Sequence, residues 1–339
     1  MKERRRIRRF AASIVLTLLL FAASKTEAYA VNELVPMGNV VGIELETGGV
    51  MVAGFSEVET ENGTRSPAAE AGVLSGDMIT QIGGRSTRSA AELLSAIASL
   101  DGDPVPVKVR REDREILLNV TPARNREGRL QLGLWMRDSV SGIGTVTYYD
   151  PESGKFGALG HGINDLDSGK LLPVEGGSIT EANVVDVVKG TPGSPGELCG
   201  KPDPDAMLGD LGRNTGCGVF GTANFAEIGA PVPIAAEQEV RLGPATILAT
   251  VSGGRVEEFQ VEISRIYRQP QDHRFLMLTV TDPRLLEQTG GIVQGMSGSP
   301  IIQNGKLIGA VTHVLVQDPV RGYGIFLENM LAACESTAA

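Results

Sequence analysis

Short apolar runs separated by turn-forming residues fill most of the chain beyond residue 40. Residues 144–149, 245–251 and 307–314 are rich in Val, Ile, Leu and Ala, and Gly, Pro, Asp or Asn stands between such runs. Runs of this length and spacing are typical of strands in a barrel or a sandwich. The pattern therefore predicts a mainly β protein, and 339 residues are enough for two domains.

The stretch 41–122 has its own order of elements. Strands are predicted at 42–45 and 50–55 with a Gly-Gly turn between them, and a closing hairpin at 105–120. A short helix is predicted from Ser66, because Pro67 and Gly72 suit a helix start and stop. A second helix, Ser89 to Leu100, is amphipathic.

A polar, charged linker over residues 123–134 separates this module from the second half, 135–339. Residues 150–154 predict a hairpin turn between two apolar runs, and more short strands follow as far as residue 314. Gly190 to Gly221 is rich in Gly, Pro and Asp, and we expect a long surface loop there.

Residues 1–30 form an export signal or an N-terminal membrane anchor. Six Lys or Arg residues precede a 14-residue apolar run from Phe10 to Ala23, and Ala28-Tyr29-Ala30 is a small-x-small cleavage pattern. Fourteen residues are short for a full membrane span. We expect the rest of the chain to cross the membrane whether the segment is removed or retained.

The net charge of −10 is unevenly distributed. Residues 1–30 carry seven Lys or Arg and two Glu, a net charge of +5, so the remainder carries −15. An acidic exported body argues against nucleic-acid partners. Cys199, Cys217 and Cys334 match no zinc spacing, and Cys199 and Cys217 could bridge a loop. No metal or cofactor is expected.

Gly295 to Pro300, Gly-Met-Ser-Gly-Ser-Pro, is the stretch best suited to chemistry. Glycines on both sides of Ser297 permit a tight turn and leave room for a substrate carbonyl. The amides of Gly295 and Ser297 could together hold an oxyanion. Ser299 is expected to support the turn. A plain Gly/Ser turn in a β protein is the structural alternative.

His161 is the best candidate for a general base among three histidines. It ends an apolar strand and lies between Gly160 and Gly162, which leaves its ring accessible. His313 alternates within a strand, where we expect a structural role, although it could line a specificity pocket. His273 lies in a polar turn and is expected to be exposed.

A third group that orients the imidazole would complete a triad. Asp282, after the strand 275–281, is the first candidate. It could equally be a helix cap, because Pro283 follows it. Asp165, Asp167 and Asp186 are rivals closer to His161 along the chain.

The run from Ser66 to Gly84, with its Ser-Pro-Ala, Ala-Gly and Gly-Asp elements, resembles a PDZ domain. The resemblance covers 31–122 and implies binding of an extended peptide by strand addition. It places the peptide-binding residues at Val41, Gly42 and Ile43, after a carboxylate-binding loop around Pro36 to Val41.

The motifs Gly157 to Ile163 and Thr279 to Pro300, after a PDZ module, resemble the stage IV sporulation protein B family of serine peptidases. The resemblance implies a trypsin-like double β-barrel with the triad His161, Asp282 and Ser297. Pro283, where we expect a Lys or a similar residue, departs from the family pattern.

This resemblance also implies export into the space between mother cell and forespore. There, the family cleaves itself and cuts a membrane-anchored regulator of an intramembrane protease, which leads to maturation of a late sigma factor. Two alternatives remain open. One is a quality-control protease of the heat-shock type, which normally has its PDZ domain after the protease. The other is a non-catalytic PDZ scaffold.

Overall fold

The computed structural model describes residues 32–112, 114–165, 169–270 and 272–336. The chain from Leu34 onward forms one compact unit. The predicted export segment, 1–30, lies outside the described residues. No helix among those described is long and apolar enough to span a membrane.

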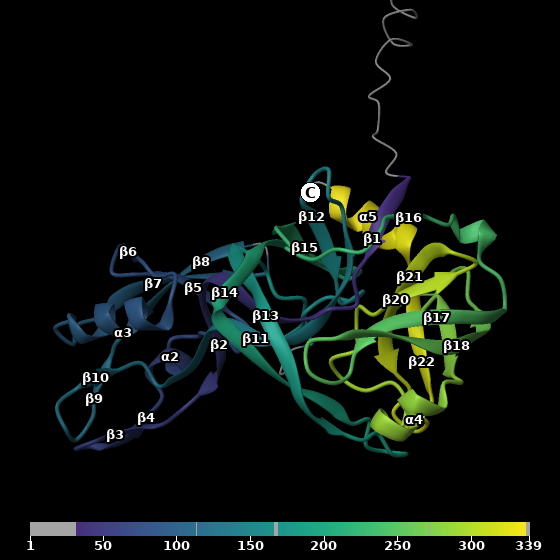
Figure 1. Cartoon of the computed structure of the whole chain (residues 1–339). Coiled ribbons are helices and arrows are strands. Elements are labelled where there is room, and N and C mark those ends of the chain that lie inside the picture. Colours follow the sequence, from purple (N-terminus) through teal and green to yellow (C-terminus); the bar gives the residue numbers. More distant parts are fainter. Residues whose placement is uncertain (1–31, 113, 166–168, 271, 337–339) are drawn as a thin grey trace, which may run out of the picture. The chain divides into compact units, whose positions relative to one another are not determined.

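Six antiparallel strands close the first barrel (Figure 1). Pairing between β2 and β11 completes the ring, and side chains from all six strands form its core. In barrel order the strands are β2 (Val40–Phe55), β11 (Leu134–Tyr149), β12 (Lys155–Ala158), β15 (Gly218–Ala223), β14 (Glu197–Thr215) and β13 (Gly176–Val188). The short strands β1 (Glu33–Pro36) and β16 (Val232–Pro233) lie outside the ring, with β1 paired to β11.

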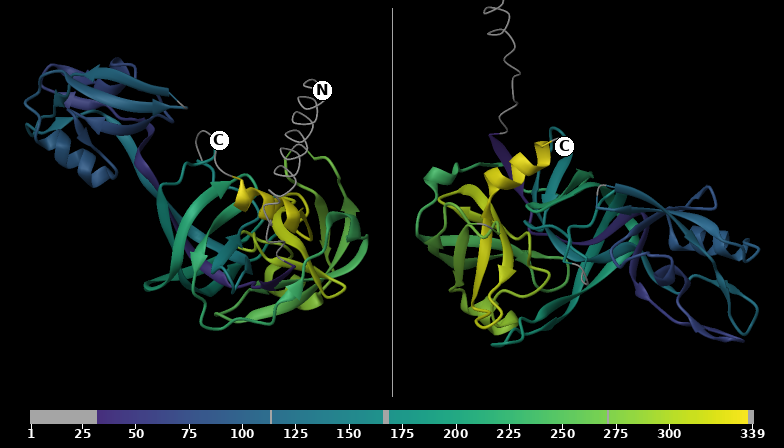
Figure 2. Two further views of the ribbon diagram at one scale, coloured as in Figure 1. Left: turned by 90° about the horizontal axis from the view of Figure 1, so that it is seen from above. Right: turned by 180° about the vertical axis from the view of Figure 1, so that it is seen from behind.

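A second closed barrel of six strands follows, and its yellow C-terminal strands can be traced in Figure 2. The two barrels confirm the predicted trypsin-like architecture. In barrel order the strands are β17 (Gly243–Thr250), β18 (Val256–Ile266), β19 (Leu276–Val280), β22 (Arg321–Phe326), β21 (Lys306–Val314) and β20 (Pro300–Gln303). The 3-10 helix η1 (Glu237–Glu239) precedes this barrel, α4 (Pro283–Thr289) follows β19, and α5 (Leu327–Glu335) follows β22.

The predicted PDZ domain has its own apolar core, built from Val, Ile, Leu and Ala of its sheet and helices. The sheet continues from β2 through β5 (Met78–Ile82), β7 (Val105–Arg111) and β8 (Arg114–Val120). Both predicted helices form, as α2 (Pro67–Glu70) and α3 (Ala90–Ala98). The remaining strands are β3 (Val58–Thr60), β4 (Gly63–Arg65), β6 (Arg85–Ser86), β9 (Ala123–Arg124) and β10 (Leu130–Gln131).

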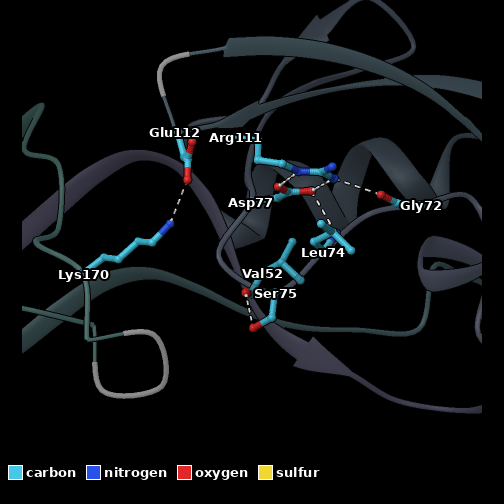
Figure 3. Close-up of polar contacts among 8 residues, drawn as sticks. All are labelled: Val52, Gly72, Leu74, Ser75, Asp77, Arg111, Glu112 and Lys170. Carbon is cyan, nitrogen blue, oxygen red and sulfur yellow. Dashed lines mark hydrogen bonds and ion pairs between the residues drawn. The ribbon is translucent and has the colours of Figure 1, made fainter.

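A buried ion pair holds the turn between α2 and β5 (Figure 3). Asp77 is 1% exposed, and its carboxylate accepts hydrogen bonds from Arg111 at 2.7 and 2.8 Å. The same carboxylate accepts from the amide of Leu74, and Arg111 also donates to the carbonyl of Gly72. This network fixes the turn at Gly76 and Asp77, which belongs to the motif that resembles a PDZ domain.

The domain boundaries differ from the prediction, because β2 and β11 each serve both domains. The first half of β2 pairs with barrel strands β11 and β13, whereas Val50 and Met51 pair with β5 of the PDZ sheet. The PDZ domain is thus inserted between two neighbouring barrel strands, and residues 33–46 belong with the peptidase. The expected Gly-Gly turn near Gly48 is instead part of one 16-residue strand.

Gly190 to Gly221 is not the long loop that its composition predicted. Most of it forms β14, which pairs with β13 on one edge and β15 on the other, so two neighbours supply its hydrogen bonds. Interruptions of the register accommodate the Gly and Pro residues. Cys199, on β14, and Cys217, just after it, are both free thiols.

Candidate active site

The loop before β20 places Ser297 between two glycines that have positive φ angles. Gly295 has φ of 94° and Gly298 has φ of 99°. A Cβ atom on Gly298 would lie 1.9 Å from the carbonyl oxygen of Thr145, so only glycine fits. Thr145 holds the loop from β11: its hydroxyl donates to the Gly295 carbonyl at 2.8 Å, and its amide donates to the Ser297 carbonyl.

The amides of Gly295 and Ser297 are available to an anion. Among the described residues neither donates to a protein acceptor, whereas the neighbouring amides of Met296, Gly298 and Ser299 all do. Two unpaired N–H groups in a tight turn are what an oxyanion hole requires. The oxyanion role of Gly295 and Ser297 stays a prediction, and their free amides are compatible with it.

The two serines of the motif have different surroundings. Ser299 is fully buried, and its hydroxyl has no hydrogen-bond partner among the residues that the structure describes. Ser297 is only partly buried, and its hydroxyl donates to the carbonyl of Thr312 at 2.5 Å. Only Ser297 is accessible enough to attack a substrate.

His161 follows β12, after Leu159 and Gly160, which both have positive φ angles. Its Nδ1 lies 2.9 Å from the carbonyl oxygen of Gly162. A carbonyl can only accept a hydrogen bond, so the neutral ring carries its proton on Nδ1. Nε2 is then free to accept a proton, as a general base must.

The ring of His161 lies against that of His313, on β21, with the centroids 4.7 Å apart. Burial lowers the pKa of His161, and the hydrogen bond to Gly162 partly opposes this shift. Burial and the neighbouring His161 lower the pKa of His313 to about 4. Both rings are therefore neutral near pH 7.

The segments that carry His161 and Ser297 meet at Thr312. A Cβ atom on Gly160 would lie 3.0 Å from the Thr312 methyl group, and the Thr312 carbonyl receives the Ser297 hydroxyl. The structure thus brings together a serine from the second barrel and a histidine from the first. No hydrogen bond joins the two side chains among the described residues.

Asp282 is not brought to His161. It is the N-cap of α4, with its carboxylate accepting from the amide of Arg284 at 2.9 Å and from that of Gln260 at 3.2 Å. The Arg284 guanidinium pairs with the same carboxylate at 2.9 Å and holds its pKa below the usual value. No hydrogen bond from Asp282 to His161 is present in the described chain. Its place in a triad stays a prediction, and the geometry favours the helix cap.

Neither of the two rival carboxylates that the structure describes is seen to bond His161. Asp165 is buried and pairs with Arg137 at 3.4 Å. Asp186 is exposed, and its carboxylate accepts from the amide of Val187. Asp167 lies outside the described residues. The group that hydrogen-bonds His161 is instead the Gly162 carbonyl, which residue types alone could not indicate.

The predicted PDZ peptide-binding residues are wrong on structural grounds. Val41, Gly42 and Ile43 lie within β2, where β11 occupies one edge and β13 the other. A strand with both edges paired cannot accept a further peptide strand.

A small, mainly apolar hollow lies elsewhere in the PDZ domain, beside α3. It is a cavity of about 130 Å³ between α3, which contributes Leu94 and Ile97, and the segment Leu130–Met136. Within the part of the chain that the structure describes, the first residues of β11, Leu134–Arg137, pair only with β2, which leaves their other edge open. Leu94, at this hollow, is 55% exposed although it belongs to an amphipathic helix, and the sequence alone did not single it out.

Residues 61–111 match the PDZ domain family. Among solved structures, the PDZ domain of the SdrC-like protein Lmo2051 from Listeria monocytogenes is 26% identical and covers 27% of this chain and 90% of its own, with a TM-score of 0.22.

The Rv3671c protease from M. tuberculosis in its active form is 15% identical and covers 59% of this chain and 76% of its own, with a TM-score of 0.33. An inactive Ser-to-Ala mutant of Rv3671c has the same identity and TM-score and covers 58% and 84%. The comparison with curated proteins found no match. Residues 128–331 match the family of the SpoIVB peptidase S55, and the chain, a serine peptidase with an inserted PDZ domain, belongs to that family.

Proposed function

We propose that this serine peptidase is an endopeptidase in which Ser297 is the nucleophile, His161 the general base, and the amides of Gly295 and Ser297 the oxyanion hole. The observation that carries the proposal is the junction at Thr312. There, the loop that carries an accessible serine meets the segments of two neutral, partly buried histidines, and two amides of this loop have no acceptor among the described residues.

In the proposed mechanism the Ser297 hydroxyl turns from the Thr312 carbonyl toward Nε2 of His161, at a cost of about 1 kcal/mol for the exchanged hydrogen bond. The oxygen attacks the scissile carbonyl as its proton moves to Nε2. The two amides stabilise the oxyanion, and His161 then protonates the leaving amine. Water, activated by the same histidine, releases the acyl group. The Gly162 carbonyl keeps Nδ1 as a donor in every step.

The PDZ domain supplies the proposed partner site for proteins and peptides. An extended segment that adds to the open edge of β11 would place an apolar side chain between Leu94 and Ile97 of α3. Leu94→Asp removes this apolar contact at an exposed position. It should weaken peptide binding about tenfold or more, with little change in thermal stability.

The proposed setting is sporulation signalling. Family membership and the basic, apolar N-terminus support an exported peptidase that cleaves itself and cuts a membrane-anchored regulator of an intramembrane protease. The space between mother cell and forespore is the proposed compartment. An acidic body with an apolar peptide groove suits protein substrates better than nucleic acid.

Expression of wild type and Ser297→Ala, followed by mass spectrometry of the N-terminal region, tests the proposal. We expect a clipped wild type and an intact mutant, because loss of the nucleophile removes several orders of magnitude in rate. Equal clipping of both chains would overturn self-cleavage. Wild-type sporulation with Ser297→Ala would instead favour the scaffold alternative.

A further inference from the structure

We infer that Asn214 is a positioning residue for the peptidase reaction, holding the backbone segment that carries His161. It lies at the end of β14, and its side-chain amide makes three hydrogen bonds to that segment. Oδ1 accepts from the amide of Ile163 at 2.9 Å, and Nδ2 donates to the carbonyls of Ile163 at 2.8 Å and Leu172 at 2.9 Å.

These contacts use the Asn214 side chain almost fully. A carboxamide offers two donors and two acceptor lone pairs, and three of these four are engaged here. The amide of Ile163 therefore depends on Asn214, whereas its carbonyl is shared between Asn214 and the amide of Leu172. Asn214 also binds the Leu172 carbonyl, so it reinforces the contact between residues 163 and 172. The backbone of Asn214 pairs with Val219 of β15, so the closed barrel fixes the position from which the side-chain amide extends.

The Asn214 side chain binds Ile163, two residues after the catalytic His161. His161 lies between Gly160 and Gly162, and glycines provide little conformational restraint. A Cβ atom on Gly162 would lie 2.6 Å from the Thr215 carbonyl oxygen, so this peptide lies directly against the end of β14. By holding Ile163, Asn214 fixes the direction of the preceding Gly162 carbonyl. That carbonyl is the acceptor for His161 Nδ1.

The orientation of the amide makes the residue type specific. Nδ2 faces two carbonyl oxygens, which require a donor, so a carboxylate in its place would face them with a like partial charge. Asn214→Asp keeps the size and the acceptor for Ile163 but loses both donors. Asn214→Ala loses all three bonds. A role in packing alone would predict that the isosteric variant behaves like wild type.

The test compares full-length wild type, Asn214→Asp and Asn214→Ala, with Asn224→Ala as the matched control. Asn224 is exposed and makes no side-chain hydrogen bond in the described chain. The readouts are kcat, KM, the pH profile of kcat and the thermal midpoint, all for cleavage of a peptide that wild type cuts. The inference rests on the proposed function, and an active wild type with an inactive Ser297→Ala establishes that function independently of Asn214.

We expect kcat to fall about 10- to 100-fold in both Asn214 variants with KM within about twofold, as a small misplacement of the base would cause. The acidic limb of the kcat profile should move toward pH 6.5, because a loosened loop admits water to His161. Folded Asn214→Asp with wild-type kcat and pH profile would overturn the inference. If Asn214→Ala does not fold, Asn214→Asp alone decides.

Discussion

Replacing Asp282 separates a helix cap from a triad member. As a cap, Asp282 bonds the amides of Arg284 and Gln260 and pairs with a guanidinium. As a triad member it would hold His161, and loss of its charge would lower kcat about 10⁴-fold, the effect known for the corresponding change in a trypsin-like enzyme. The structure predicts the first outcome.

The expected loss of stability follows from the contacts. Asn at this position keeps an acceptor for the Arg284 amide, and Asn is as good a cap as Asp. It loses an ion pair whose guanidinium is about half exposed, and solvent screening makes that loss small. It also loses an acceptor for the Gln260 amide, which costs about 1–2 kcal/mol. Asp282→Asn should therefore cost about 2 kcal/mol. Asp282→Ala, without the cap, should cost about 3 kcal/mol.

The assay must separate loss of activity from loss of folded enzyme. The thermal midpoint and the rate at which a fluorophosphonate labels Ser297 are therefore measured on the same samples, with labelling carried out at temperatures below the unfolding range. We expect both variants to label at close to the wild-type rate, with the loss confined to the thermal midpoint. A stable Asp282→Asn that labels and cleaves thousands of times more slowly would refute this reasoning. It would show that α4 moves Asp282 to His161 in the active enzyme.

Three further predictions follow from the geometry. Burial lowers the pKa of His161, so the acidic limb of kcat/KM should have its midpoint below pH 6.5. Burial also lowers the pKa of His313 to about 4, so the free energy of unfolding should decrease as the pH falls from 6.5 toward 4; a free energy of unfolding that stays constant over this range would contradict the prediction. Gly298→Ala should abolish fluorophosphonate labelling, because its Cβ meets the Thr145 carbonyl at 1.9 Å in a positive-φ conformation; wild-type labelling would show that the loop can shift. Arg111→Ala removes the cation from the buried Asp77 carboxylate and should destabilise the PDZ domain by about 3 kcal/mol. Hydrogen exchange in β5 and β7 should become faster while cleavage of a short peptide stays unchanged, and unaltered exchange would show that this ion pair contributes little to stability.

The sequence by itself determined where the chain turns tightly and where helices begin. The glycines around Ser297 predicted a tight turn, and the turn has the positive φ angles that only glycine adopts readily. Pro67 and Ser89 marked the starts of α2 and α3 correctly, because caps and fixed φ angles act within a few residues. The ambiguity at Asp282 was also present in the sequence, since an Asp before a Pro suits both roles.

Strand partners and long-range neighbours were decided by the tertiary structure. Gly190 to Gly221 looked like a loop by composition, yet two barrel strands satisfy its backbone and make it β14. Val41 to Ile43 looked like a peptide-binding edge, yet both edges of β2 are already occupied. Residue types determined which groups could react and where the chain could turn. Which carbonyl orients His161, which strand edge stays open and which serine stays accessible depend on hydrogen bonds between residues far apart in the chain.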